Sequence, residues 1–301
     1  MVGRSTEQLH TAAFGLDLLE STTLASVLLE AQVAAAQSVL SASSKIADAA
    51  NAMARTIKAG ARIHYFAAGS SGLMAAADMM ELGGTFSIPA GQLAVHMAGG
   101  VPQSVEMPGD VEDATDELRA TASAIGDTDT AVFISASGTT PYTVAAAEMV
   151  KPTGATLVGI ANNDGAPLLD LADIAIFLKT PPEVLAGSTR LGAATAQKIA
   201  LNTLSTAMAV ELGHVHDGMM VNVFADNIKL KERAKGIVCN ISQVPDALAQ
   251  SALDDANGRV KEAILIAGLG VSPAEASAIL SRTSGHLRPA LEAGKHQSNR
   301  E

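Results

Sequence analysis

Short apolar runs alternate with segments of helical periodicity through the middle of the chain. Each run is five to seven residues long and apolar almost throughout, which is typical of parallel strands buried on both faces. Helical spacing of apolar positions separates the runs, and a short turn is expected at 168–172. This alternation indicates an α/β fold with a doubly wound parallel sheet of five strands. The predicted strands are 61–67, 92–97, 130–134, 156–161 and 174–178, and the intervening helices are 72–82, 112–124 and 141–150.

Helical patterns also precede and follow this region. Residues 15–58 have the spacing of long N-terminal helices, and residues 188–212 form a long predicted helix with Ser188 as its N-cap. The second of these is rich in alanine, leucine and methionine on most faces. A helix that is apolar nearly all round needs burial on more than one side. This pattern favours a homodimer.

The end of the chain reads as a small helical bundle. Its predicted helices are 245–255, 257–267 and 272–281, the last starting favourably because Pro273 stands in its first turn. Residues 295–301 are polar and are expected to fray. We therefore expect an α/β domain with its N-terminal helices over residues 1–240 and a C-terminal helical subdomain over residues 241–301.

Composition narrows the classes of partner. The chain has 301 residues, 48% hydrophobic and 17% charged, so it is long and apolar enough for a globular core. A net charge of −11 and an aromatic content of only 3% argue against nucleic acid. A single cysteine excludes an intrachain disulfide and fits a reducing compartment. With no signal-peptide pattern and no apolar span of about 20 residues, we expect a cytoplasmic protein with no membrane partner.

Two glycine–serine loops each follow a predicted strand and precede a predicted helix. They are residues 68–72 (Ala-Gly-Ser-Ser-Gly) and residues 135–140 (Ser-Ala-Ser-Gly-Thr-Thr). Backbone N–H groups at a helix start and side-chain hydroxyls both donate hydrogen bonds to phosphate. Either loop alone reads as an ordinary turn, and neither matches a nucleotide fingerprint, but the two together indicate a phosphorylated small molecule. The residues expected to hold its phosphate are Ser70, Ser71, Gly72, Ser137, Gly138 and Thr140.

Two glutamates are candidates for acid–base chemistry. Glu81 ends an otherwise apolar helical segment, where partial desolvation would raise its pKa and keep it protonated, as a general acid requires. The alternative is a solvated glutamate at a helix end. Glu112 lies in an acidic first turn after Asp110, where the residues alone favour a solvated helix face.

No metal site is predicted from the spacing of ligating residues. His214 and His216 flank Val215, but no acidic or cysteine partner lies at a recognisable distance along the chain. Cys239 stands in an apolar stretch and reads as an inert buried thiol rather than a nucleophile.

At these motifs the chain resembles the sugar isomerase (SIS) domain family, and within it the N-acetylmuramic acid 6-phosphate etherases. The resemblance extends over nearly the whole chain, and its most distinctive block lies between Thr195 and Thr206. The stretches that carry it are Thr6-Glu7-Gln8, Gly69-Ser70-Ser71-Gly72, Asp78-Met79-Met80-Glu81 with Thr85, Ala98-Gly99-Gly100, Glu112-Asp113, Ala136-Ser137-Gly138 with Thr140-Pro141-Tyr142, Glu183-Val184, Gly187-Ser188-Thr189-Arg190, Thr195-Ala196-Gln197-Lys198, Leu201-Asn202, Leu204-Ser205-Thr206, Asn227 and Lys229-Leu230.

The resemblance implies a flavodoxin-like SIS sheet, a homodimer, no cofactor and a phosphorylated amino sugar as ligand. It implies that Glu81 protonates the departing lactyl ether oxygen and that Glu112 removes the proton at sugar C2. Glu183 and Arg190 are expected at the substrate. In related isomerases a glutamate in the context of Glu183 shuttles a proton between C2 and C1, so Glu183 either does so here, orients the open-chain sugar, or is only a loop carboxylate.

The sequence departs from the etherase pattern at several positions. Leu73, Thr139 and Gly192 stand where etherases carry basic residues, and Gly83-Gly84 replaces a proline pair. Each charge-assisted hydrogen bond is worth roughly 1.5–3 kcal/mol, so these changes predict a divergent member with a thinned basic shell.

The expected activity is that of a carbon–oxygen lyase. It would cleave the lactyl ether of N-acetylmuramic acid 6-phosphate, or of a related phosphosugar, to N-acetylglucosamine 6-phosphate and D-lactate. Two alternatives remain open on the sequence. One is an aldose–ketose phosphosugar isomerase with Glu183 as its base. The other is a non-catalytic phosphosugar sensor. A sensor that regulates transcription should carry a DNA-binding module, and no basic helix-turn-helix segment is visible in this sequence.

Overall fold

The computed structural model describes residues 5–107, 111, 118–223, 225 and 227–298, without the side chains of residues 295–298. The chain divides into two compact units. The first comprises residues 1–79 and 90–207, and the second comprises residues 80–89 and 208–301. The predicted boundary after residue 240 falls inside α8 (Ile228–Ser242). The structure divides the chain earlier because α8 packs in the same core as the helices that follow it.

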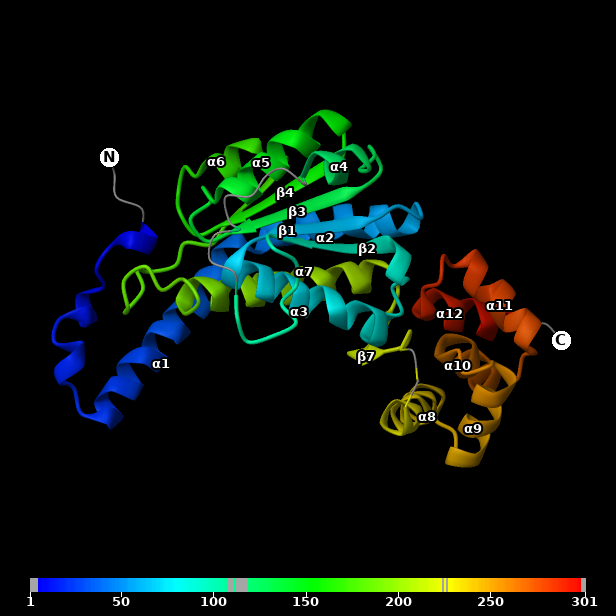
Figure 1. Ribbon diagram of the computed structural model, residues 1–301. Coiled ribbons are helices and arrows are strands. Elements are labelled where there is room, and N and C mark those ends of the chain that lie inside the picture. The colour runs from blue at the N-terminus through cyan, green and yellow to red at the C-terminus, as the bar shows by residue number, and fades with distance from the viewer. Residues whose placement is uncertain (1–4, 108–110, 112–117, 224, 226, 299–301) are drawn as a thin grey trace. The chain divides into compact units, whose positions relative to one another are not determined.

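The first unit contains a parallel sheet of five strands in the order β2-β1-β3-β4-β5 (Figure 1). The predicted strands are confirmed within two residues. Strands β1, β3 and β4 are buried almost throughout, which explains why they read as unbroken apolar runs. The strands are β1 (Ile63–Ala67), β2 (Leu93–Met97), β3 (Thr130–Ser135), β4 (Thr156–Ala161) and β5 (Ile174–Phe177).

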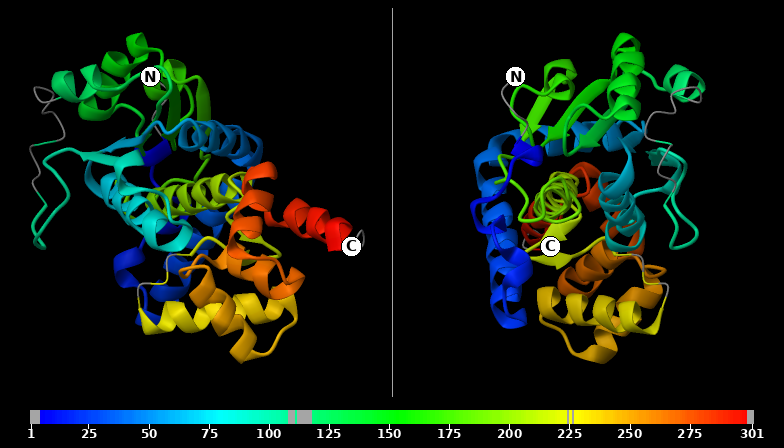
Figure 2. Two further views of the ribbon diagram at one scale, coloured as in Figure 1. Left: turned by 90° about the vertical axis from the view of Figure 1, so that its right-hand side faces the viewer. Right: turned by 60° about the vertical axis from the view of Figure 1, so that its left-hand side comes forward.

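Helices cover both faces of this sheet (Figures 1 and 2). On one face lie α4 (Leu118–Ser123), α5 (Pro141–Val150) and α6 (Pro167–Leu171), over a core that includes Phe66 and Phe133. On the other lies α2 (Ser43–Lys58), with its buried side directed at β1, β3 and β5. Helix α5 matches its prediction. Of the helix predicted over 112–124, residues 112–117 lie outside the described part of the chain.

Two long helices begin in the first unit and end in the second. They are α3 (Gly69–Phe86) and α7 (Gly192–Glu211). Helix α3 starts three residues earlier than predicted and continues through Gly83-Gly84. Helix α7 starts four residues later than predicted, so Ser188 is not its N-cap. Residues 188–191 form turns instead, in which the Leu191 N–H donates to the Ser188 carbonyl at 3.1 Å.

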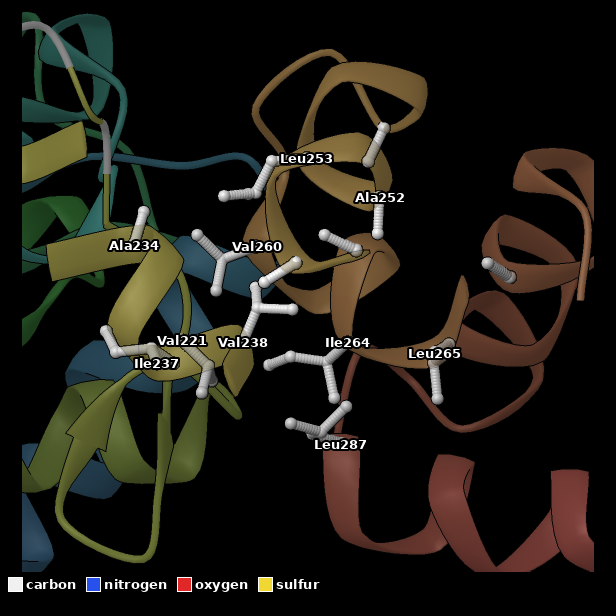
Figure 3. Close-up of a cluster of buried hydrophobic side chains, with 14 of the residues drawn as sticks. Val221, Ala234, Ile237, Val238, Ala252, Leu253, Val260, Ile264, Leu265 and Leu287 are labelled. Carbon is white, nitrogen blue, oxygen red and sulfur yellow. The ribbon is translucent and has the colours of Figure 1, made fainter. Parts of the chain in front are cut away.

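The second unit is a helical bundle with a short hairpin, β6 (Val215–His216) and β7 (Met219–Met220). Its core surrounds α10 (Val260–Leu269), which packs against the other bundle helices (Figure 3). Ser272 and Glu275 form a capping box at the start of α11. The sequence reading missed α8, α12 and the hairpin, and α12 continues to Ser298, where fraying was predicted. The remaining bundle helices are α9 (Asp246–Asp255), α11 (Pro273–Arg282) and α12 (Leu287–Ser298).

One helical run is more apolar than the sequence reading allowed. The run Ser21–Lys58, made of α1 (Ser21–Ser38), a 3-10 turn and α2, is long and apolar enough to span a membrane by length and composition. The bent pair α10–α11 also passes this test when the two are taken together. However, α2 packs on the sheet and α10 lies in the bundle core. Burial inside the protein accounts for the apolar character of α10, whereas only 11% of the apolar window in Ser21–Lys58 is buried and α1 buries Ala35 alone.

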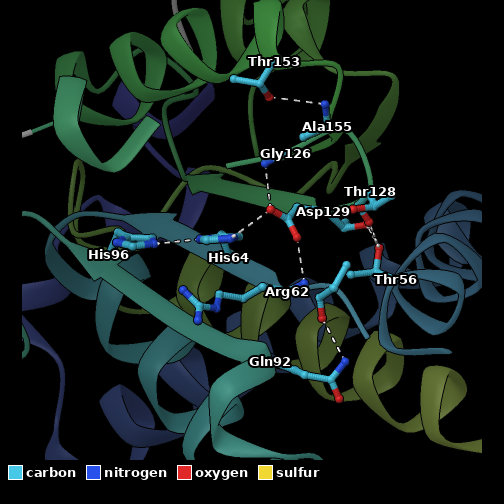
Figure 4. Close-up of polar contacts among 12 residues, drawn as sticks. Thr56, Arg62, His64, Gln92, His96, Gly126, Thr128, Asp129, Thr153 and Ala155 are labelled. Carbon is cyan, nitrogen blue, oxygen red and sulfur yellow. Dashed lines mark hydrogen bonds and ion pairs between the residues drawn. The ribbon is translucent and has the colours of Figure 1, made fainter. Parts of the chain in front are cut away.

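An Asp–His–His chain lies beside β1 and β2 (Figure 4). The buried His64 ring stands between His96, at 3.0 Å from Nδ1 to Nε2, and Asp129, at 3.7 Å from Nε2 to Oδ2. Asp129 also accepts the backbone N–H groups of Arg62 and Gly126. Burial lowers the pKa of His64, and it lowers the pKa of His96 to about 4, with His64 and Arg62 adding to the effect. Both rings are therefore neutral at pH 7.

This chain predicts acid sensitivity of the fold. An unfolded histidine has a pKa of about 6.5, so between pH 6.5 and 4 the unfolded state binds more protons than the folded state. Stability is then fully present above pH 6.5 and falls as the pH drops through this window. The lowered pKa of His96 corresponds to a loss of about 2 kcal/mol in the free energy of unfolding across this window, after a reduction for the partial exposure of the ring. In urea unfolding, the free energy of unfolding should fall less between pH 7.5 and pH 5 for His96→Gln than for the parent. Equal losses would contradict the assignment.

Candidate functional site

The two glycine–serine loops lie on either side of the point where the strand order reverses. Loop 68–72 follows β1 and loop 135–140 follows β3, and these strands are neighbours in the sheet. The chain moves outward from β1 to β2 and, in the other direction, from β3 to β5. In doubly wound sheets, ligands bind beyond the carboxyl ends of strands at this switch point. The predicted loops thus meet where the fold favours a ligand.

The second loop is held by its own hydroxyl groups. The buried Ser135 Oγ lies 2.8 Å from Thr140 Oγ1 and 3.3 Å from Ser137 Oγ. It also accepts the Gly138 N–H at 3.0 Å, while Ser137 Oγ accepts the Thr139 N–H at 3.2 Å. Ser135 belongs to the loop that the sequence analysis singled out, but it was not among the residues assigned to the phosphate. Its contacts orient the two hydroxyls predicted to bind phosphate.

Glycine is required at Gly138 by both conformation and space. Its φ is +66°, and a Cβ there would lie 2.4 Å from the Cβ of Ala166 and 3.0 Å from that of Ala161. In the first loop, a Cβ on Gly72 would lie 2.7 Å from Met97 Sδ. The Gly72 N–H donates to the Ala68 carbonyl, and the Gly138 N–H donates within its loop. Both backbone donors assigned to phosphate are therefore engaged inside the chain.

The first loop forms the opening turn of α3. Ser70 is half-buried and Ser71 is buried, at 8% exposure. Glu81 lies ten residues beyond Ser71 on the same helix, a rise of about 15 Å. It belongs to the second unit and is exposed. The expectation that apolar neighbours desolvate Glu81 is wrong within this chain, because its side chain lies outside the buried stripe of α3. Glu112 lies outside the described residues.

Glu183 caps the start of α7. Its side chain is buried at 5% exposure, and its two carboxylate oxygens accept the N–H groups of Gly192 and Ala193, each at 2.8 Å. A carboxylate at a helix N-terminus is stabilised by these donors and by the helix dipole. A Cβ on Gly192 would lie 3.1 Å from Glu183 Oε2, so a side chain there would crowd the carboxylate. Arg190, in the turn before α7, is exposed.

A buried polar cluster that the sequence reading missed joins α3 to α7. Asp78, at 3% exposure, accepts hydrogen bonds from Tyr65 Oη at 3.1 Å, Asn202 Nδ2 at 2.7 Å and Ser205 Oγ at 2.8 Å. Burial raises the pKa of Asp78 against the lowering effect of these bonds, and it raises the pKa of Tyr65 well above its ordinary value. An aspartate inside an apolar helical segment was the available signal.

No metal centre emerges from the part of the chain that the structure describes. Within those residues, no group of three or more histidine, cysteine, aspartate or glutamate side chains comes together. His216 lies 3.6 Å from the Asp217 carboxylate in the β6–β7 hairpin. Cys239 is half-buried rather than buried, and burial together with Asp246 raises the pKa of its thiol.

Comparison with known proteins agrees with this geometry. The SIS domain family model matches residues 104–207. An N-acetylmuramic acid 6-phosphate etherase of Deinococcus radiodurans is 40% identical over 97% of this chain and 96% of its own length. The chain belongs to the N-acetylmuramic acid 6-phosphate etherase family. Etherases of Rubrobacter xylanophilus, 36% identical over 96% of both chains, and of Streptomyces coelicolor, 39% identical over 83% of this chain and 81% of the relative, are further members.

The family resemblance noted in the sequence is thereby confirmed. The SIS model covers β3 to β5 and most of α7, whereas the etherase relatives align through both units. Membership in the etherase family thus includes the bundle that follows the SIS sheet.

Proposed function

We propose that this chain is a carbon–oxygen lyase. It cleaves the lactyl ether of N-acetylmuramic acid 6-phosphate, or of a closely related phosphosugar, to N-acetylglucosamine 6-phosphate and D-lactate. One observation carries this proposal. The chain is 34–40% identical to etherases that align with nearly its whole length. The two loops at the switch point of the sheet support a phosphorylated ligand.

The proposed reaction proceeds by elimination and hydration and needs no cofactor. In the open-chain sugar the C1 aldehyde acidifies the C2 proton, which Glu112 removes. The C3–oxygen bond then breaks as Glu81 protonates the leaving lactate oxygen, and a C2–C3 double bond forms. Water adds its oxygen to C3 and a proton to C2, giving the product amino sugar. General acid and base groups of this kind are each worth about 10²–10⁴-fold in rate.

The phosphate is proposed to lie between the two loops. Ser70, Ser71 and Gly72 would face it from the start of α3, with Ser137, Gly138 and Thr140 from the second loop. Leu73 and Thr139 contribute no charge, so neutral donors carry this recognition. Arg190, in its exposed turn, is the basic residue proposed to contact the substrate, and Glu183 is proposed to line the site beside it.

The isomerase alternative is weakened by the position of Glu183. Both of its oxygens accept backbone N–H groups of α7 at 2.8 Å. As a base it would lose the negative charge that favours its bonds to the N-terminal N–H groups of α7. Glu183 therefore fits an orienting role better than that of a base.

The N-terminal region supports a homodimer. Phe14, Leu18, Leu29, Val33 and Leu40 are between 57% and 100% exposed in the single chain. A second copy of this chain is the proposed cover, because one chain leaves these apolar side chains unburied. Helix α7, in contrast, is mostly buried by its own chain. Sedimentation at micromolar concentration should give a dimer, and Val33→Lys should shift it toward monomer. A parent that sediments as a monomer would reject this. The lone cysteine fits a reducing cytoplasm.

The activity is tested directly on the purified protein. Incubation with N-acetylmuramic acid 6-phosphate in deuterated water should release D-lactate and place deuterium at C2 of the product. Appearance of a ketose phosphate without lactate would favour the isomerase. Binding of phosphosugars without exchange or release would favour the sensor.

A further inference from the structure

Asn163, just beyond the end of β4, uses every hydrogen-bonding position of its side chain. Its Oδ1 accepts from Ser5 Oγ at 2.8 Å and from the Thr6 N–H at 3.2 Å. Its Nδ2 donates to Thr6 Oγ1 at 3.0 Å and to the Ser137 carbonyl at 3.2 Å. A carboxamide has two donors and two acceptor sites, so all four are satisfied. The side chain is buried, at 4% exposure, and therefore holds a fixed geometry.

These bonds join the start of the chain to the second loop. Ser5 and Thr6 belong to the 3-10 turn Ser5–Glu7, in which Thr6 is 3% exposed. They lie 157–158 residues from Asn163 in sequence. The turn also places Glu7 next to Gly187, in the segment before α7. A Cβ built on Gly187 would lie 3.5 Å from Glu7 Oε2. The turn thus borders two segments assigned to the phosphosugar.

The bond to Ser137 has a specific consequence for the loop. The Ser137 carbonyl and the Gly138 N–H belong to one planar peptide unit. Asn163 Nδ2 holds its oxygen, and Ser135 Oγ holds its N–H at 3.0 Å. With both ends fixed, this peptide cannot rotate without breaking a buried hydrogen bond, which keeps Gly138 at its φ of +66° and Ser137 Oγ in place.

We propose that the turn Ser5–Glu7 supports the phosphosugar site, and that Asn163 and Thr6 are positioning residues that hold loop 135–140 in its phosphate-binding shape. This rests on the proposed function only for the identity of the sugar. Asn163 and Thr6 act through the Ser137–Gly138 peptide rather than by touching the substrate. The N-terminal residues are accordingly a component of ligand binding and not merely an anchored end.

The test compares binding with turnover in full-length variants. Asn163→Asp keeps the shape but removes both donors, and Thr6→Val removes the hydroxyl. Since each loses about one or two hydrogen bonds to the turn or loop, titration calorimetry should show about tenfold weaker binding of inorganic phosphate and of N-acetylglucosamine 6-phosphate. KM should rise with kcat nearly unchanged, and Thr6→Ser should restore parent values.

Asn162→Asp is the matched control. The Asn162 side chain bonds Gln197 at 2.9 Å and Thr180 at 3.3 Å rather than the turn or the second loop. It should lower stability but leave phosphate affinity unchanged. Parent-like affinity in Asn163→Asp and Thr6→Val, despite a lower melting temperature, would overturn the proposal. A parent that binds phosphosugar but releases no lactate would reject the etherase while the binding comparison stands.

Discussion

Glu81→Gln is expected to lose lactate release by about 10²–10⁴-fold and to keep exchange of the C2 proton with solvent. A glutamine side chain cannot protonate the departing ether oxygen, which is a poor leaving group as an alkoxide. Removal of the C2 proton precedes that step and is assigned to Glu112. The measurement follows D-lactate enzymatically and deuterium at C2 by NMR in the same incubation with N-acetylmuramic acid 6-phosphate.

The companion variants separate the possible roles. Glu112→Gln should lose both exchange and release, because no later step occurs without the first. Glu183→Gln should keep exchange and impair release only indirectly. Glu148→Gln, which alters another exposed glutamate on α5, should leave both reactions unchanged. Exchange that depends on Glu183 and not on Glu112 would overturn the assignment in favour of the isomerase.

Gly138→Ala is expected to damage both the fold and phosphosugar binding. The substitution places a Cβ at φ +66° and within 2.4 Å of the Ala166 Cβ. A methyl group next to the backbone cannot move aside as a long side chain can. Backbone strain and overpacking each cost about 1–3 kcal/mol, so we expect about 3 kcal/mol or more of lost stability. Urea unfolding and titration with N-acetylglucosamine 6-phosphate measure the two effects.

Gly165→Ala is the matched control for backbone strain alone. Its φ is +61°, but a Cβ there meets no atom within 4 Å. It should cost only about 1–2 kcal/mol and leave phosphosugar affinity unchanged. Equal effects of the two variants would show that the contact with Ala166 does not hold the loop.

The sequence alone determined the sheet and the two loops at its switch point. Strands β1, β3 and β4 are buried on both faces, so their residues had to be apolar without interruption, and the signal is local. The loops after β1 and β3 were recognisable because two strand-to-helix turns of one chain both carry glycine and hydroxyl residues. The start of α11 was likewise recognisable locally, from Pro273 directly after Ser272.

Only the tertiary structure decided the features that depend on distant partners. Helix α7 starts at Gly192 because Glu183, nine residues away, caps it, and not at the local signal Ser188. Glu81 is exposed because the orientation of α3, and not its composition, selects the buried stripe. Helices α8 and α12 are amphipathic in sequence, and the sequence reading did not recognise this pattern; in the structure both pack against α10.

The contacts of Asn163 are the clearest case. Nothing near residue 163 in the sequence indicates Ser5 or Thr6, and they meet only because the fold brings the chain's start to the carboxyl ends of β3 and β4. Hydrophobic periodicity and capping act over a few residues, so they can be read directly from sequence. A buried side-chain hydrogen bond depends on the position of two backbones that the whole core sets, and this is why the site's supporting contacts required the structure.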